Sequence, residues 1–403
     1  MSDLPLAGIR VVDLTSMLAG PFASMLLADM GADVVKVESP AGDFTRDQGP
    51  FTEDDEQRQF GGYFQSINRN KRGIVLDLRT AEGRDATERL VRHADVLIEN
   101  YRNGVMDRLG LSYEHLQTVN PRLVYASIRG FGDRRTGESP MADWPAYDLT
   151  VQAISGVMAT TGEPDGPPTK VGPGIGDIVP ALFSVAGLLA AVVKAQATGQ
   201  GSFVDVAMYD AMLALCERQI YQHSYTGAVP GRQGSSHPLL SPFDVLPCRD
   251  GWVSIAAPSD THWARLCAVM GHDELIEDPR TAMAGDRVSN RAFVREVIES
   301  WTGQRTKREI VELLGGQVAV GAVQTVDDIY ADPHVQARRM LVDIDQPGPA
   351  RNVTIVGRPI KFLGTEEPAL RRAPLLGEHT DEVLAELDEL DATIRAESKE
   401  NRN

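Results

Sequence analysis

The sequence IRVVDLTSMLAGPFASMLLADMGADVVKV, residues 9–37, carries the clearest fold signal of this chain. Its β-branched ends, 9–14 and 33–37, predict two strands, and 21–30 between them predicts a helix that ends near Gly31. The alternation continues downstream, with strands predicted at 74–78, 95–98 and 123–128 and a helix predicted at 81–93. Strand–helix alternation is typical of an α/β fold, so we expect a Rossmann-like large domain with a parallel sheet.

Four loops follow the predicted strands and are expected to lie near one another. In parallel sheets of this kind, ligands bind outside the carboxyl ends of the strands. The sequence therefore predicts a site built from the loops at 15–20, 39–48, 100–104 and 130–132.

The middle of the chain holds an almost wholly apolar run, 178–193, interrupted only by Ser184. It is shorter than the roughly 18–20 residues that a membrane-spanning helix needs, so it predicts a buried core helix. A strand at 203–207 and a helix at 210–221 follow, and then a loop rich in Gly, Pro and Ser at 227–242.

We expect three parts along the chain. Residues 1–224 form the large domain, with a linker from about 200. Residues 225–325 form a smaller α+β domain, and 326–403 form a return linker and a C-terminal part that completes the large domain. The patterns behind this division are a strand at 251–256, helices at 262–270, 290–302 and 307–314, a strand-like stretch at 352–361 and an amphipathic helix at 378–398.

Composition narrows the function. The 403 residues carry 40 Lys+Arg against 57 Asp+Glu, a net charge of −17, which disfavours nucleic acid and anionic membranes as partners. The N-terminus has no secretory pattern, so a cytoplasmic location is expected. The three cysteines have no CxxC spacing and the eight histidines no HExxH, so we expect no metal.

Arginine far exceeds lysine, 33 residues against 7. This bias on an acidic chain is consistent with adaptation to a salty cytosol or with a GC-rich genome. Unfolding at low salt would separate the two explanations, because net charge speaks to solubility and not to fold.

Asp177 is the strongest candidate for chemistry. It follows the glycine-rich stretch 172–176 and immediately precedes the apolar run. At a helix N-cap its carboxylate would accept backbone N–H bonds and be favoured by the helix dipole, so we expect it to stay ionised at neutral pH. Carboxylates act as covalent nucleophiles, and the alternative is that Asp177 only caps the helix.

Basic residues cluster just before the third predicted strand, at 68–72, and Arg102 and Arg108 lie near the next strand–helix junction. Lysine and arginine suit phosphate groups, so a phosphorylated cofactor is one candidate partner. The alternative is a set of ordinary surface ion pairs with Asp77, Glu82 and Asp107.

Two common enzyme classes lack their signatures. Neither the glycines at 172, 174 and 176 nor the first strand–helix turn at 15–21 has GxGxxG spacing, which argues against a dinucleotide-binding enzyme. No GxSxG motif is present, which disfavours a serine hydrolase of that type.

Four stretches together resemble the class III (CaiB/BaiF) CoA-transferases, a family that includes formyl-CoA transferase and, by fold, alpha-methylacyl-CoA racemase. The resemblance runs from about Leu6 to Leu384. The stretches are 6–15 with 19–21 and 27–38, then 70–72 with 76–78, then 147–148 through 161–168 to 176–177, and finally 372–380.

The resemblance implies that Asp177 is the catalytic aspartate and forms an aspartyl-CoA thioester. It also implies that coenzyme A is a substrate, that no cofactor is tightly bound, and that two chains form an interlocked, ring-shaped homodimer. The positions matching CoA-contacting residues of the family are Leu18, Ala19, Ser39, Asn68, Arg69, Asn70, Lys71, Asn100, Tyr101, Arg102, Arg108, Pro145, Ala146, Tyr147 and Asp148. Some relatives carry Gln at the position of Leu18 and Arg at that of Ser39, so contacts to CoA at these two positions must be made by the backbone or be absent.

Two other functions remain open at this point. Racemisation needs acid/base groups on two faces of the substrate, and racemases carry His where this chain has Tyr147. Tyrosine, with an ordinary pKa of about 10, is a poor base at neutral pH, so transfer is favoured. A non-catalytic CoA-binding protein is disfavoured because Asp177 is intact.

The substrates are predicted only from the acyl-site loop. The family's glycine lid corresponds here to 231–237, which is poorer in glycine. Arg232 and His237 in this loop favour a carboxylate-bearing acyl group. We therefore expect succinyl-CoA as donor and a small dicarboxylate such as mesaconate, malate or itaconate as acceptor.

Overall fold

The computed structural model describes residues 3–346 and 351–400. Residues 1–2, 347–350 and 401–403, which belong to the expected parts 1–224 and 326–403, lie outside the described residues. The chain divides into two compact units. Unit 1 comprises 1–157, 171–221 and 337–403, and unit 2 comprises 158–170 and 222–336.

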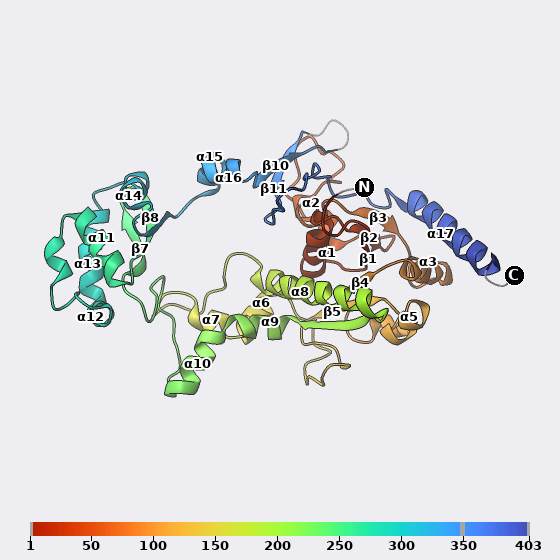
Figure 1. Cartoon of the computed structure of the whole chain (residues 1–403), viewed down its shortest axis with the longest axis horizontal. Helices are drawn as coiled ribbons and strands as arrows, with labels where there is room; N and C mark the ends of the chain where they lie inside the picture. Colours follow the sequence, from red (N-terminus) through yellow and green to blue (C-terminus); the bar gives the residue numbers. More distant parts are fainter. Residues whose placement is uncertain (1–2, 347–350, 401–403) are drawn as a thin grey trace. The chain divides into compact units, whose positions relative to one another are not determined.

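Unit 1 is built on a six-stranded parallel sheet with the order β3-β2-β1-β4-β5-β6 (Figure 1). This is the strand order of a doubly wound Rossmann fold, so the α/β prediction is confirmed. The strands are β1 (Arg10–Asp13), β2 (Asp33–Glu38), β3 (Arg72–Val75), β4 (Val96–Glu99), β5 (Val124–Arg129) and β6 (Ser202–Ala207).

Helices cover both faces of this sheet. Alternate residues of a strand point to opposite faces, and here Val11 and Ile98 pack against α1 (Ala19–Asp29) and α8 (Ile175–Thr198). Their neighbours Val12 and Leu97 join a second core on the other face. That core includes residues of α3 (Ala81–Arg92), α5 (Tyr113–Val119) and α17 (Thr380–Glu400).

The remaining elements of the unit are short. They are η1 (Phe44–Asp47), α2 (Gly62–Asn68), α4 (Val105–Arg108), α6 (Asp148–Ile154), α7 (Val157–Thr160), α9 (Met208–Leu215), α10 (Glu217–Thr226), α16 (Pro333–Ala337), β10 (Leu341–Ile344) and β11 (Val353–Val356), of which α7, α10 and α16 reach across the unit boundaries.

Several expected boundaries were wrong. The third strand spans Arg72–Val75 and not 74–78, because its backbone ladder with β2 runs from Arg72, opposite Val35, to Val75. The helix expected at 210–221 is broken at Cys216 into α9 and α10. The strand-like stretch 352–361 shortens to β11, which pairs only with β10 in a two-stranded antiparallel sheet.

The apolar core helix is longer than expected. Helix α8 has 24 residues and begins at Ile175, not at 178. Among the described residues it is the one helix long and apolar enough to cross a membrane by length and composition. Its buried face packs on α1, β5 and β6. Core helices can reach the same length and apolar character as membrane-spanning ones.

Unit 2 is a small α+β unit. Its antiparallel sheet has the order β7 (Phe243–Cys248), β8 (Gly251–Ala256) and β9 (Ala319–Ala322). Buried residues of β7 and β8 share one core with α11 (Asp260–Met270), α13 (Arg291–Thr302) and α14 (Lys307–Leu314). The other elements are η2 (Asp273–Ile276), α12 (Ala284–Ser289) and α15 (Val326–Ala331).

The loop 231–237 lies in unit 2 together with the turn at 162–166. Gly234 N donates to Gly162 O over 2.9 Å, and the Arg232 guanidinium donates to Gly166 O over 2.6 Å and to Glu163 O over 3.1 Å. These guanidinium donors of Arg232 therefore bind backbone carbonyls, which argues against Arg232 as the residue that binds a substrate carboxylate.

Candidate active site

A cavity of about 210 Å³ opens at the carboxyl ends of the strands in unit 1. Loops 15–20, 100–104 and 130–132 all contribute to it, as the strand pattern predicts, whereas no residue of 39–48 lines it. Eight of the residues singled out from the sequence line it: Ala19, Asn100, Tyr101, Arg102, Pro145, Ala146, Tyr147 and Asp177.

Side-chain amides hold these loops together. Asn100 accepts a hydrogen bond from Ser16 N over 3.0 Å and donates to Ser16 O over 2.7 Å. Asn103 donates to Gly132 O over 3.1 Å and to Ala142 O over 2.7 Å. The loops after β1, β4 and β5 therefore form one hydrogen-bonded wall.

Asp177 is the third residue of α8 and lies inside the first turn of the helix, not at the N-cap as expected. The N-cap is Gly174, and Asp177 N donates to Gly174 O over 3.2 Å. The expected capping role was wrong because the glycine-rich stretch continues into the helix and places Asp177 on its first turn. Within the described residues its carboxylate has no hydrogen bond or ion pair, and it faces the cavity.

The expectation that Asp177 stays ionised at neutral pH is met only in part, because its carboxyl is close to its titration midpoint there. Burial, and secondarily the charge of Asp148, raise the pKa of Asp177 to about 7. The helix N-terminus favours a carboxylate, but here desolvation and a neighbouring negative charge outweigh that effect.

Asp148 begins α6 and is tied to the start of α8. Its Oδ1 accepts hydrogen bonds from Gly176 N over 2.8 Å and from Gln152 Nε2 over 2.8 Å. Gly176 is required for this approach, because a Cβ there would lie 2.6 Å from Val151 Cγ2 and 2.7 Å from Asp148 O. The two carboxylates of Asp148 and Asp177 therefore sit on one tightly packed pair of helix starts.

Arg102 and Arg108 are exposed, and in the parts of the chain described neither makes an ion pair. Arg102 lines the cavity. Arg108 lines a second hollow of about 640 Å³, and Asn103 contributes to both. Free guanidinium groups beside a cavity can bind phosphate oxygens.

The basic cluster at 68–71 is buried instead. Lys71 Nζ donates to Asp13 Oδ2 over 3.0 Å, to Pro21 O over 3.0 Å and to Asn68 Oδ1 over 2.7 Å. Arg69 pairs with Asp29 over 2.6 Å, and Asn70 donates to the same carboxylate over 2.7 Å. The counter-charges of Lys71 and Arg69 are thus the buried Asp13 and Asp29, whereas Arg72, the last residue of the stretch 68–72, pairs with the half-buried Asp33 and the exposed Glu382 and Glu386.

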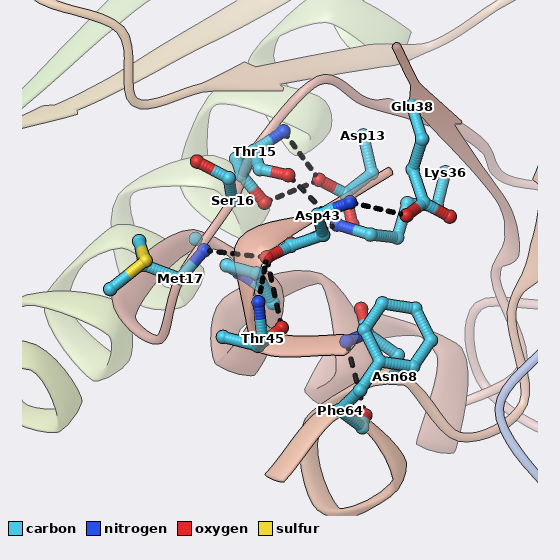
Figure 2. A network of polar contacts seen from close by, with 12 residues as sticks. Asp13, Thr15, Ser16, Met17, Lys36, Glu38, Asp43, Thr45, Phe64 and Asn68 are labelled. Carbon is cyan, nitrogen blue, oxygen red and sulfur yellow. Dashed lines mark hydrogen bonds and ion pairs between the residues drawn. The ribbon is translucent and has the colours of Figure 1, made fainter. Parts of the chain in front are cut away.

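Asp13 also belongs to a buried polar network with Thr15, Lys36 and Asp43 (Figure 2). Lys36 Nζ donates to Asp43 Oδ2 over 3.0 Å and to Thr15 O over 2.8 Å. Asp43 Oδ1 accepts from Met17 N over 3.4 Å, and Met17 has a left-handed φ of 68° that non-glycine residues rarely adopt. The network therefore supports the strained loop that lines the cavity.

Leu18 and Ser39 lie outside the cavity lining. Leu18 is the residue before α1, where its O accepts from Phe22 N over 2.9 Å. Ser39 is exposed at the end of β2 and its O accepts from Gly42 N over 2.8 Å.

Sequence reasoning missed several residues of the site. Arg129 lines the cavity, forms ion pairs with Glu99 and Asp133, and donates to Tyr101 O over 2.9 Å. Trp144 and Met208 also line the cavity, and Tyr63 feels the charge of Asp177, which adds to burial in raising its pKa. Of these four residues, Arg129 carried a signal, because it directly follows the strand predicted at 123–128.

No metal is indicated. Over 3–346 and 351–400, no group of three or more His, Cys, Asp or Glu side chains could hold an ion. Among these described residues, the site offers the unpaired Asp177 carboxylate, the Arg102 guanidinium and a hydrogen-bonded wall, and Arg108 lies in the hollow that shares Asn103 with it.

A doubly wound sheet with a free carboxylate at its ligand-binding edge is the framework of an α/β enzyme. The chain belongs to CoA-transferase family III, whose family model matches residues 6–380. It is an enzyme of this family, so the transferase prediction is confirmed.

Similar proteins of known name are also CoA-transferases. The chain is 50% identical over 390 residues to the succinyl-CoA:mesaconate CoA-transferase of Haloarcula hispanica, covering 97% of this chain and 98% of that protein. It is 40% identical to the succinate–glutarate CoA-transferase of Agrobacterium fabrum, covering 96% and 97%. The crystal structure of a CaiB/BaiF family protein from Brucella suis superposes with a TM-score of 0.84, 39% identity, and coverage of 96% and 100%.

Proposed function

We propose that this enzyme transfers CoA from succinyl-CoA to a small dicarboxylate, with mesaconate as the first candidate, through an aspartyl-CoA thioester on Asp177. The observation that carries the proposal is the Asp177 carboxylate, which has no partner in the described part of the chain and faces a cavity of about 210 Å³. A carboxylate without hydrogen bonds is free to attack a thioester carbonyl.

The reaction runs in four steps. Asp177 attacks the succinyl thioester carbonyl and expels CoA thiolate, leaving a mixed anhydride. The thiolate attacks the Asp177 carbonyl, releases succinate and leaves the aspartyl-CoA thioester. The acceptor carboxylate then attacks that thioester and expels the thiolate again. The thiolate finally attacks the acceptor's acyl carbon, which forms the new acyl-CoA and restores the Asp177 carboxylate without ATP.

The environment of Asp177 suits this chemistry. Burial weakens the solvation of its carboxylate, and the pKa near 7 leaves a large ionised fraction at neutral pH. A poorly solvated carboxylate gains more from attack on a carbonyl than a fully hydrated one does. The negative charge of Asp148 repels an ionised Asp177, and acylation of Asp177 removes this repulsion, which favours the neutral acyl-aspartate.

Arg102 and Arg108 are our first candidates for the CoA phosphates, because both are exposed and unpaired within the described chain. Asn100, Tyr101 and 145–147 line the cavity and would contact the pantetheine arm. The buried side chains of 68–71 would act from beneath, by supporting α1 and the loop at 15–18. Leu18, Ser39 and Asp148 lie outside the lining, so backbone or indirect roles fit them better.

The substrate proposal rests on the relatives' names. Succinyl-CoA or succinate appears with mesaconate, glutarate or D-citramalate in the names of relatives 36–50% identical to this chain. Malate and itaconate remain alternative acceptors for this chain. A screen in which only monocarboxylic or aromatic acids are converted would refute the dicarboxylate proposal.

We also propose a cytoplasmic homodimer. Helix α8 exposes Leu182, Phe183 and Val193, of which Val193 is 67% exposed, and exposed apolar patches of this kind mark interaction surfaces. A second copy would cover them. Light scattering should give twice the mass of 43.8 kDa, and a monomeric mass at working concentrations would overturn this assembly.

Mass spectrometry tests the mechanism directly. The enzyme is mixed with succinyl-CoA without acceptor, quenched in acid and digested, and we expect a CoA adduct on the peptide containing Asp177. Asp177→Asn should form none. An absent adduct, with exchange of the α-protons of the acyl group in heavy water, would favour the racemase function instead.

A further inference from the structure

Gln152 is a fully buried amide in α6, and both of its hydrogen bonds lead toward Asp177. Its side chain is 0% exposed. Nε2 donates to Asp148 Oδ1 over 2.8 Å, and Oε1 accepts from Val171 N over 2.9 Å. Asp148 lies one turn earlier on the same helix, so the two side chains share one helix face. A buried amide is costly unless both ends are satisfied, and here both are.

The two hydrogen-bond partners of Gln152 hold the two ends of the segment that leads to Asp177. Val171 begins the loop that leads into α8, and Gly176 N donates to the Asp148 oxygen that Gln152 also holds. The stretch 171–176 is therefore fixed near both ends, directly at Val171 and through Asp148 at Gly176. Gln152 itself does not line the cavity.

Packing leaves this arrangement little freedom. Gly176 is buried against Val151 and the backbone of Asp148, where a single added Cβ would already clash. The start of α8 can come no closer to α6, and the hydrogen bonds to Asp148 oppose its moving away. The separation of the two helix starts is thus defined from both directions.

The charge of Asp148 depends on the same geometry. It is the second cause, after burial, that raises the pKa of Asp177 to about 7. Coulomb interaction falls with distance, so its size depends on where the Asp148 carboxylate is held.

We propose that Gln152 is a positioning residue: its amide fixes the Asp148 carboxylate and the 171–176 segment, and so sets the placement and reactivity of Asp177. This rests on the proposed role of Asp177 as the nucleophile. Gln152 acts through its two partners and touches no substrate.

The test uses Gln152→Glu and Gln152→Met in the full-length enzyme. Adduct formation on Asp177 is followed in single turnovers with succinyl-CoA from pH 5.5 to 9. We expect both variants to react about 10-fold or more slowly at their best pH, with KM for succinyl-CoA within about two-fold. Gln152→Glu places a second carboxylate against Asp148. The rate of adduct formation rises with pH as Asp177 ionises, and in this variant the midpoint of that rise should move upward by about half a pH unit or more. In Gln152→Met it should not move upward.

Gln65→Met is the matched control, because Gln65 is also buried and its Oε1 accepts from Ala373 N over 3.1 Å. We expect lower thermal stability but an unchanged midpoint. Folded Gln152 variants with wild-type rates and midpoints would overturn the proposal. It would also be overturned if the Gln152 variants lost no more rate than Gln65→Met and the midpoint of Gln152→Glu did not move. A wild-type enzyme that forms no adduct refutes the proposed function itself.

Discussion

Asp148 Oδ1 accepts a 2.8 Å hydrogen bond from the backbone N–H of Gly176, the residue that precedes Asp177. The bond ties the N-terminal turn of α6 to that of α8 and places two carboxylates in one electrostatic environment. The pKa of Asp177, raised to about 7 by burial and by Asp148, follows from that arrangement.

Removing the Asp177 charge should stabilise the fold at alkaline pH. Because the folded-state pKa is raised above the ordinary value of 3.8, folding favours the protonated acid, and stability is lost as pH rises from about 4 through about 7. We expect Asp177→Asn to be inactive yet more stable than the wild type by about 1–3 kcal/mol at pH 8. Urea unfolding should show the difference shrinking toward pH 5, and equal stability at pH 8 would contradict the burial argument.

Neutralising Asp148 should move the pH dependence of adduct formation on Asp177 downward, opposite to the upward shift expected for Gln152→Glu. Asp148→Asn keeps an oxygen that can accept from Gly176 and Gln152 but removes the negative charge. We expect the rising limb of adduct formation to move down by up to about one pH unit, with burial keeping it above the ordinary carboxyl range. An unshifted limb in a folded variant would show that Asp148 does not act on Asp177 through charge.

A methyl group at Gly176 should disrupt the site. Its Cβ would lie 2.6 Å from Val151 Cγ2, so α8 must move away from α6. We expect Gly176→Ala to lose about 1–3 kcal/mol of stability and most of its activity. Gly172→Ala is the control, since a Cβ there meets nothing within 4 Å. Similar thermal melts and rates for the two variants would argue against close packing as the requirement.

Lys71→Met should damage the fold more than substrate binding. Lys71 faces Asp13, and both side chains are fully buried, so the substitution leaves a buried carboxylate without its nearest cation. We expect a loss of roughly 3–5 kcal/mol in urea unfolding, partly recovered when Asp13→Asn is added. A stable variant with a strongly raised KM for succinyl-CoA would instead identify Lys71 as a direct CoA contact.

Arg102→Ala and Arg108→Ala should each raise KM for succinyl-CoA by about 5–50-fold with little change in kcat, because each removes a charge-assisted contact to phosphate. Added salt should reduce the difference from the wild type through screening. Arg308→Ala, on unit 2 and 86% exposed, is the control and should behave as the wild type. Equal KM values in all three variants would remove these arginines from CoA binding.

The sequence by itself determined the parallel sheet and pointed to Asp177 as the candidate nucleophile. Local periodicity at 9–37 and 95–128 encodes strands and helices, because alternation and helical spacing depend on neighbours in the chain. The parallel sheet and the loops after β1, β4 and β5 could be predicted in this way, whereas Asp177 was singled out by its place after the glycines at 172–176 and by the family resemblance.

Only the tertiary structure decided how charges are used. Lys71 and Asp13 are 58 positions apart, and Arg69 and Asp29 are 40 apart, so no local pattern indicates that they form buried pairs rather than a phosphate site. The same holds for Asp177, whose expected N-cap environment was replaced by burial beside Asp148. Ionisation and pairing depend on solvent exclusion and on distances through space, and folding sets both.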